Sequence, residues 1–154
     1  MGMEIERKFL VRDLRWKSMA QGVLLRQGYL SSAPERVVRV RIEGDRALLT
    51  IKGRNIGAAR GEWEYPVPLF DAQTFLDELC ERPIIEKLRY RIPLHGLVWE
   101  VDEFLGDNAG LIVAEVELHH PDQAFDKPEW VGEEVTHDPR YFNANLLRHP
   151  YSKW

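Results

Sequence analysis

The sequence lacks the residues from which disulfides and Cys/His metal sites are built. It contains one cysteine, Cys80, so an internal disulfide is excluded. Its five histidines show neither a His-Glu-x-x-His motif nor Cys/His ligand spacing. These absences fit a reducing compartment and favour a cytoplasmic location. Cys80 itself is expected to be a small apolar residue that packs on a helix.

Long apolar runs and basic runs are absent too. No apolar stretch approaches the roughly 20 residues of a membrane span, and the N-terminus, already charged at Glu4, is not that of a signal peptide. Charged residues make up 30% of the chain, but their signs nearly cancel to a formal net charge of -4. Without a basic tail or run, neither a membrane nor a nucleic acid is expected as a partner.

Most of the chain alternates apolar and polar residues, which is typical of half-buried strands. We expect one domain over residues 1–154 in the α+β class, mainly antiparallel β with a few helices. The alternation predicts eight strands, near 3–10, 23–31, 37–43, 46–54, 62–68, 85–93, 97–104 and 111–119. Helical spacing predicts a helix over 71–81, with Asp71 as N-cap, and a second short helix over 141–148.

On seven of the eight predicted strands, ionisable residues dominate one face. The first strand carries Glu4, Glu6 and Lys8 there. Basic strands contribute Arg39, Arg41, Lys52, Lys87 and Arg89, and acidic strands contribute Glu62, Glu64, Glu100, Asp102, Glu115 and Glu117. An antiparallel sheet with one solvated face also alternates. However, like charges two residues apart repel one another, so the segregation of signs by strand favours a binding role.

The two kinds of charged strand suit a metal-complexed polyphosphate. Paired arginines donate planar forks to phosphate oxygens, and paired carboxylates bind hard divalent cations. Eight strands can close into a barrel whose interior holds side chains or one small ligand. We therefore predict an eight-stranded closed β-barrel, a tunnel with a charged, water-filled lumen. Helices packed outside, the segment 120–130 or a partner subunit must cover its apolar outer face.

These residues resemble a known family. Glu4-x-Glu6-x-Lys8 looks like the ExExK signature of the CYTH superfamily, the triphosphate tunnel metalloenzymes. The resemblance continues through the charged strands to Glu134-Val135-Thr136 and Tyr141-x-Asn143, so it spans nearly the whole chain. It implies a single triphosphate tunnel domain that binds a triphosphate and cleaves or rearranges it with Mg²⁺ or Mn²⁺.

Position by position, the resemblance implies three groups of site residues. Phosphate would be bound by Lys8, Arg39, Arg41, Lys52, Lys87 and Arg89. The metal ligands would be Glu4, Glu6, Asp102, Glu115 and Glu117. The catalytic residues would be Lys8, Glu62 and Glu64, with the two glutamates positioning the attacking water or helping to take its proton. The competing role of Glu62 and Glu64 is to form salt bridges with the basic strands.

The predicted activity is hydrolysis of inorganic tripolyphosphate to pyrophosphate and phosphate, with weaker action on nucleoside triphosphates. A cyclase needs a base-recognition pocket, and the compact chain shows no obvious one. Class IV adenylate cyclase and thiamine triphosphatase remain alternatives within the family. A polyphosphate-binding module without turnover is the non-enzymatic alternative. Aromatic residues on the outer face, together with the resemblance, are compatible with a homodimer.

Overall fold

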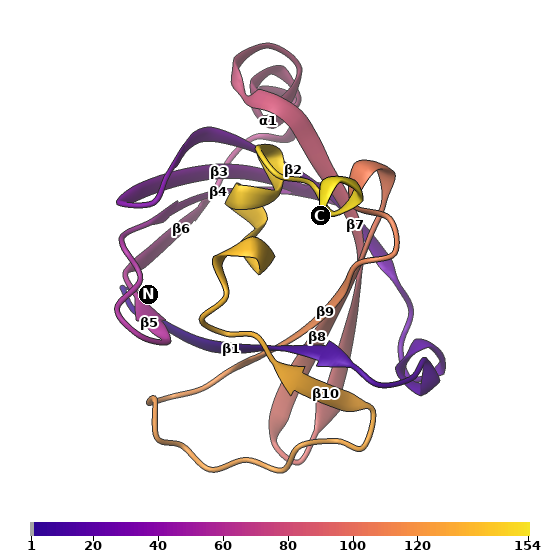
Figure 1. Cartoon of the computed structure of the whole chain (residues 1–154). Coiled ribbons are helices and arrows are strands. Elements are labelled where there is room, and N and C mark those ends of the chain that lie inside the picture. The colour runs from indigo at the N-terminus through magenta and orange to yellow at the C-terminus, as the bar shows by residue number, and fades with distance from the viewer. Residues whose placement is uncertain (1) are drawn as a thin grey trace.

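An antiparallel sheet forms most of the protein. The computed structural model describes residues 2–154. The strands are β1 Glu4–Val11, β2 Val23–Ala33, β3 Arg36–Glu43, β4 Arg46–Lys52, β5 Ala59–Arg60, β6 Glu62–Pro66, β7 Glu81–Leu94, β8 Leu97–Phe104, β9 Ile112–Glu117 and β10 Val131–Glu134. Their order in the sheet is β10-β1-β9-β8-β7-β2-β3-β4-β6, with β5 paired to β1. Figure 1 shows the sheet curled around a central space.

The prediction of a closed eight-stranded barrel is wrong, because the sheet that residues 2–154 form has ten strands and is not closed. Within residues 2–154, the path of paired strands ends at β10 and at β6. Closure would require β6 to pair with the outer edge of β1. That edge is shared by β10, which pairs with the C-terminal half of β1, and by β5, which pairs at Glu4 and Ile5. Two backbone hydrogen bonds link Gly2 to Glu62 across the remaining gap.

The first helical segment begins and ends two residues earlier than the sequence pattern predicts. The helix expected over 71–81 is α1 Leu69–Thr74 followed by the π-helical turn η2 Phe75–Leu79, and its N-cap is Pro68 instead of Asp71. It ends early because β7 already begins at Glu81. Two further 3₁₀ turns are η1 Arg15–Ser18 and η3 Gly106–Asn108. Among residues 2–154, no helix has both the length and the apolar character needed to cross a membrane.

One apolar core lies between α1 with η2 and the outer face of β3 and β4. Its buried residues are Val40, Ala47, Ala72, Leu76 and Cys80. Ala72 and Leu76 are 0% exposed, so the helix covers this part of the sheet as expected. Cys80 packs in the same cluster, which confirms its structural role.

A second, aromatic core covers the outer face of β1, β9 and β8. The Trp99 ring lies 5.7 Å from Phe9, 5.8 Å from Phe125 and 5.9 Å from Trp130, measured between ring centroids. Phe125 and Trp130 come from the 118–130 connection, so the predicted cover of the outer face by the segment 120–130 is confirmed. Trp63 on β6 is 39% exposed. The homodimer that such aromatics suggest stays a prediction.

The C-terminal segment packs inside the curled sheet, which corrects the expectation that every helix lies outside. It forms the 3₁₀ turns η4 Pro139–Tyr141, η5 Asn143–Leu147 and η6 Tyr151–Lys153, and Figure 1 shows it within the ring of strands. The core cluster there comprises Tyr29, Val37, Ile85, Phe104, Leu111, Val113, Val135, Tyr141, Leu146 and Leu147. At this end the inward positions of the strands are apolar, so they bury an apolar segment. The predicted charges line only the rest of the interior.

Candidate active site

Alternate residues of β1 face the interior, as the predicted parity requires. Glu4 and Lys8 are buried, and the Lys8 Nζ lies 2.9 Å from Oε1 of Glu6 and 2.9 Å from Oε1 of Glu115. Burial alone would lower the pKa of Lys8, but the carboxylates of Glu115 and Glu6 outweigh it and raise this pKa. Lys8 is therefore a firmly charged ammonium group held between two acids.

Acidic side chains gather on three neighbouring strands. The register places Glu6 of β1 opposite Glu117 of β9, and Glu115 of β9 opposite Glu100 of β8. Like charges directly opposite one another destabilise a sheet. Accordingly, burial and then the charges of Glu4 and Glu6 raise the pKa of Glu117. This acidic wall, defined by Glu4, Glu6, Glu100, Glu115 and Glu117, concentrates carboxylates that a cation would stabilise.

A basic wall lies on β3 and β4. The Arg39 Nη2 donates to Oγ1 of Thr50 at 3.2 Å. The Nε atoms of Arg39 and Arg41 are both buried and have no hydrogen-bond partner among residues 2–154. Among residues 2–154, Arg41 makes no ion pair, and burial followed by the charges of Arg39 and Arg89 lowers its pKa to about 10. These two Nε donors therefore carry the cost of a buried polar group without a hydrogen bond.

A buried ion triad joins β7 to β8. Arg89 donates from Nε and Nη2 to the two oxygens of Asp102, at 2.7 and 2.8 Å. The Lys87 Nζ lies 2.8 Å from Oδ2 of the same carboxylate. Burial would raise the pKa of Asp102, but Arg89 and then Lys87 lower it to about 2. Burial, only partly offset by the Asp102 charge, lowers the pKa of Lys87 to about 8.

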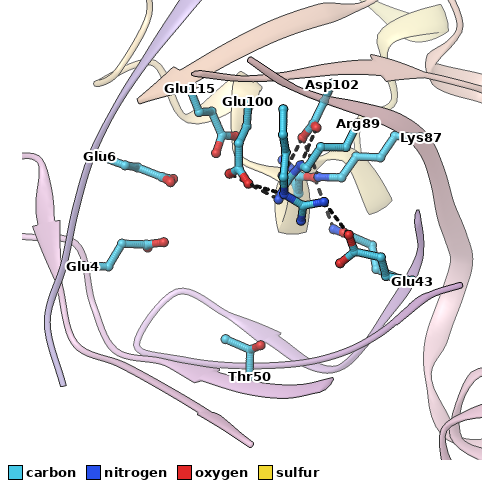
Figure 2. A network of polar contacts seen from close by, with 12 residues as sticks. Glu4, Glu6, Glu43, Thr50, Lys87, Arg89, Glu100, Asp102 and Glu115 are labelled. Atoms are coloured by element: carbon cyan, nitrogen blue, oxygen red, sulfur yellow. Dashed lines mark hydrogen bonds and ion pairs between the residues drawn. The ribbon is translucent and has the colours of Figure 1, made fainter. Parts of the chain in front are cut away.

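The triad places Asp102 across the interior from Glu4 and Glu6, two of the other predicted metal ligands. Figure 2 shows Glu4 and Glu6 pointing into the interior from one side, while Asp102 meets Arg89 and Lys87 on the other. Asp102 is 0% exposed and both of its oxygens are bonded to cations. Its contacts are those of an anchor for the two bases, and its role as a metal ligand stays a prediction.

Glu62 and Glu64 lie beside the basic wall. The Glu64 Oε2 accepts from Oγ1 of Thr50 at 2.7 Å and lies 3.6 Å from Nη2 of Arg39. The Glu62 Oε2 lies 3.3 Å from Nζ of Lys52, which also pairs with Glu4 at 3.0 Å. These contacts match the salt-bridging alternative, and the role of the two glutamates toward water stays a prediction.

A cavity of about 390 Å³ opens between the two walls. Eight predicted site residues line it, namely Glu4, Glu6, Lys8, Arg39, Lys52, Lys87, Arg89 and Glu115, whereas Arg41, Glu62, Glu64, Asp102 and Glu117 lie outside its lining. The lining contains seven lysines and arginines but only three carboxylates. The cavity therefore carries excess positive charge, which suits an anionic ligand.

Two lining residues escaped the sequence prediction. Arg60 on β5 is partly buried and donates from Nε and Nη2 to the Gly53 carbonyl oxygen at 3.1 and 2.8 Å. It stands two residues before Glu62, so extending the parity of that strand would have found it. Asn143 belongs to the Tyr141-x-Asn143 part of the family resemblance but had no predicted role, and it lies in a 3₁₀ turn, where no alternation could have marked it.

The acidic wall fits a divalent cation in its donor chemistry. Glu4, Glu6, Glu115 and Glu117 offer only carboxylate oxygens, the ligands that hard divalent ions prefer. Within residues 2–154, no three acidic, histidine or cysteine side chains converge closely enough to hold a metal ion as they stand. The physical reason is that the ammonium groups of Lys8 and Lys52 occupy the space between the acids. Cation binding there requires these lysines to change partners.

By fold and site, the protein is a curled antiparallel sheet that encloses a cavity lined mainly by basic side chains. The CYTH domain model matches residues 2–151, so the chain belongs to the CYTH family. It is 51% identical over 154 residues to an inorganic triphosphatase of Acetivibrio thermocellus, covering 100% of this chain and 99% of that protein. It is also 38% identical over 148 residues to an inorganic triphosphatase of Nitrosomonas europaea, covering 93% and 95%.

Solved structures are similar to this protein too. The crystal structure of an inorganic triphosphatase superposes with a TM-score of 0.66 at 36% identity, covering 93% of this chain and 96% of that chain. A protein from Hippeastrum superposes with a TM-score of 0.58 at 14% identity, covering 79% of this chain and 81% of that one. At that identity the second likeness shows the fold alone.

Proposed function

We propose that this protein hydrolyses inorganic tripolyphosphate to pyrophosphate and phosphate with the help of a divalent metal ion. The observation that carries the proposal is the pair of buried Nε donors of Arg39 and Arg41, which lack a hydrogen-bond partner within residues 2–154. Buried positive charge of this kind calls for a compact polyanion that offers several oxygens. The two curated relatives, both inorganic triphosphatases, support the same activity.

Substrate binding is assigned to Lys8, Arg39, Arg41, Lys52, Lys87 and Arg89. Phosphate oxygens would take the free donors of the arginines and the third N–H of Lys87. Lys8 and Lys52 exchange their present carboxylate partners for phosphate. Nucleoside triphosphates would present the same phosphates with a bulky base attached, which accounts for the weaker action we propose on them.

Glu4, Glu6, Glu115 and Glu117 would hold Mg²⁺ or Mn²⁺. When bound, the ion supplies charge neutralisation at the phosphate oxygens. The oxygen of a water molecule attacks the terminal phosphorus, and the bridging P–O bond breaks with its electron pair going to pyrophosphate. Glu62 or Glu64 orients this water and takes its proton. The lone buried Cys80 supports a cytoplasmic setting for this reaction.

A phosphate-release assay tests the activity directly. Purified protein is incubated with tripolyphosphate, ATP or thiamine triphosphate, with Mg²⁺, with Mn²⁺, or with a chelator. We expect fastest release from tripolyphosphate and none with the chelator. Formation of cyclic AMP from ATP without phosphate release from tripolyphosphate would establish the cyclase alternative instead. Tight binding of tripolyphosphate without turnover would establish the binding module.

Arg60→Ala is expected to raise KM for tripolyphosphate roughly fivefold, which corresponds to about 1 kcal/mol for a partly exposed cation. Arg60 lines the cavity, and burial lowers its pKa although Glu4 and Glu6 act in the opposite sense. Steady-state kinetics measure the change. Arg46→Ala, at an exposed position on β4, is the matched control and should leave KM unchanged. An unchanged KM in the Arg60 variant would exclude contact with substrate.

A further inference from the structure

Lys87 is held by one residue from the sheet and one from the C-terminal segment. Its Nζ contacts Oδ2 of Asp102 at 2.8 Å and Oδ1 of Asn143 at 2.6 Å. Lys87 is 1% exposed, yet it contributes to the cavity lining. An ammonium group has three N–H donors. Two fixed acceptors therefore determine the direction of the third donor, which remains for a ligand in the cavity.

The orientation of Asn143 is itself fixed. Its Oδ1 also accepts a hydrogen bond from Nε2 of Gln27 at 3.2 Å, and the same Nε2 donates to the Tyr29 hydroxyl at 3.0 Å. Gln27 is 0% exposed. Both groups that contact this atom of Asn143 are donors, and an amide accepts hydrogen bonds through its oxygen and not through its nitrogen. The Asn143 side-chain oxygen must therefore face Lys87. A charge-assisted bond of this kind is stronger than one between neutral groups.

The segment that carries Asn143 is anchored directly after η5, on its C-terminal side. Arg148 donates from Nη2 to Oγ of Ser32 at 2.5 Å, and the backbone N–H of Tyr151 donates to Oδ1 of Asn108 at 2.9 Å. Leu146, 0% exposed, packs into the inner core cluster. The Asn143 amide is thus presented to Lys87 from a fixed backbone and not from a free tail.

We propose that Asn143 is a positioning residue for phosphate binding, and that through it the C-terminal segment completes a site begun by the sheet. Asn143 draws the Lys87 Nζ away from exclusive pairing with Asp102, whose oxygens also hold Arg89. Without Asn143, the Lys87 ammonium can turn fully onto the Asp102 carboxylate, and its third N–H is no longer held toward the cavity. This inference rests on the proposed function, because it assumes a phosphate ligand in the cavity.

A double-mutant cycle tests the role of Asn143. Asn143→Ala, Lys87→Ala and the double variant are compared with the wild type, using kcat and KM for tripolyphosphate and its Kd by calorimetry with a chelator present. In the wild-type background, Asn143→Ala should weaken Kd and raise KM on the order of tenfold, with a smaller change in kcat. In the Lys87→Ala background, Asn143→Ala should change Kd less than twofold, as roughly expected for an effect that acts through Lys87.

Equal losses in the two backgrounds would overturn the inference, because they would show a structural effect independent of Lys87. Asn145→Ala controls for loss of the segment, because Asn145 lines the cavity from the same turn but its side chain, within residues 2–154, hydrogen-bonds only the Pro139 carbonyl oxygen and not Lys87. If the alanine variant at Asn143 melts early, Asn143→Ser keeps a polar side chain that is too short to reach Nζ and should give the same coupling. If the wild type binds tripolyphosphate without cleaving it, the proposed function is wrong, but the double-mutant cycle measured on Kd still tests the role of Asn143. Absence of both binding and cleavage overturns both.

Discussion

Replacing Arg41 by alanine is expected to lower kcat/KM for tripolyphosphate by about 100-fold or more, the typical loss when one preorganised charge donor is removed. The same change should leave the melting temperature of the free protein unchanged or higher. Arg41 is buried, lacks an ion pair within residues 2–154, and lies close to the charges of Arg39 and Arg89. Removing it relieves desolvation and repulsion, and costs only the interaction that a bound anion would make.

Phosphate release and thermal melting of the same preparation measure the two effects. Arg36→Ala is the matched control, because Arg36 lies on the same strand but is exposed and pairs with its neighbour Glu35 at 2.8 Å. It should change neither quantity. A large fall in the melting temperature of the Arg41 variant, with activity retained, would show that Arg41 serves the fold instead of the ligand.

Asp102→Asn is expected to lower the free energy of unfolding by about 3–5 kcal/mol, because removing one member of a buried ion cluster leaves its partners uncompensated. Here the uncompensated groups are Lys87 and Arg89, which are both buried. Urea denaturation at neutral pH measures the change. If Asp102 were instead a free metal ligand repelled by its acidic neighbours, the variant would be as stable as the wild type or more stable.

The pH dependence of stability gives an independent test of the triad. The pKa of Asp102 is about 2 in the folded protein, below its ordinary value of 3.8. A carboxyl group whose pKa is lower in the folded state stabilises the fold at any pH above its pKa in the unfolded state. This stabilisation is lost as the pH falls through its pKa in the folded state. The difference in free energy of unfolding between the wild type and Asp102→Asn should therefore shrink as the pH falls from 4 to 2. Glu129→Gln, which removes an exposed partner of Arg15, should show no such convergence.

The parity of charges along each strand predicted much of the site. Lys8, Arg39, Lys87 and Glu115 are far apart in sequence, yet all line one cavity. This was predictable because side-chain alternation is a local property of an extended backbone and needs no knowledge of the neighbouring strand. By the same rule Trp99, which precedes the inward Glu100, faces outward, and it packs in the outer aromatic core.

Closure of the sheet was not predictable in this way. It depends on which segment occupies the outer edge of β1, and β5 and β10 take that edge although the sequence pattern marked neither as a strand. A two-residue strand such as Ala59–Arg60 is too short to show alternation. The helix over 141–148 was placed outside for a related reason, since its apolar residues reveal that they are buried but not against which face.

The sequence by itself determined which charges face inward, beginning with Glu4, Glu6 and Lys8, because the alternation of side chains between two faces is a property of each strand separately. The tertiary structure alone decided which charge meets which. Register between strands sets Glu6 against Glu117 and Arg89 against Asp102. Long-range packing likewise brings Asn143 to Lys87, 56 residues away along the chain. Such pairings depend on contacts between distant segments, and no local pattern encodes them.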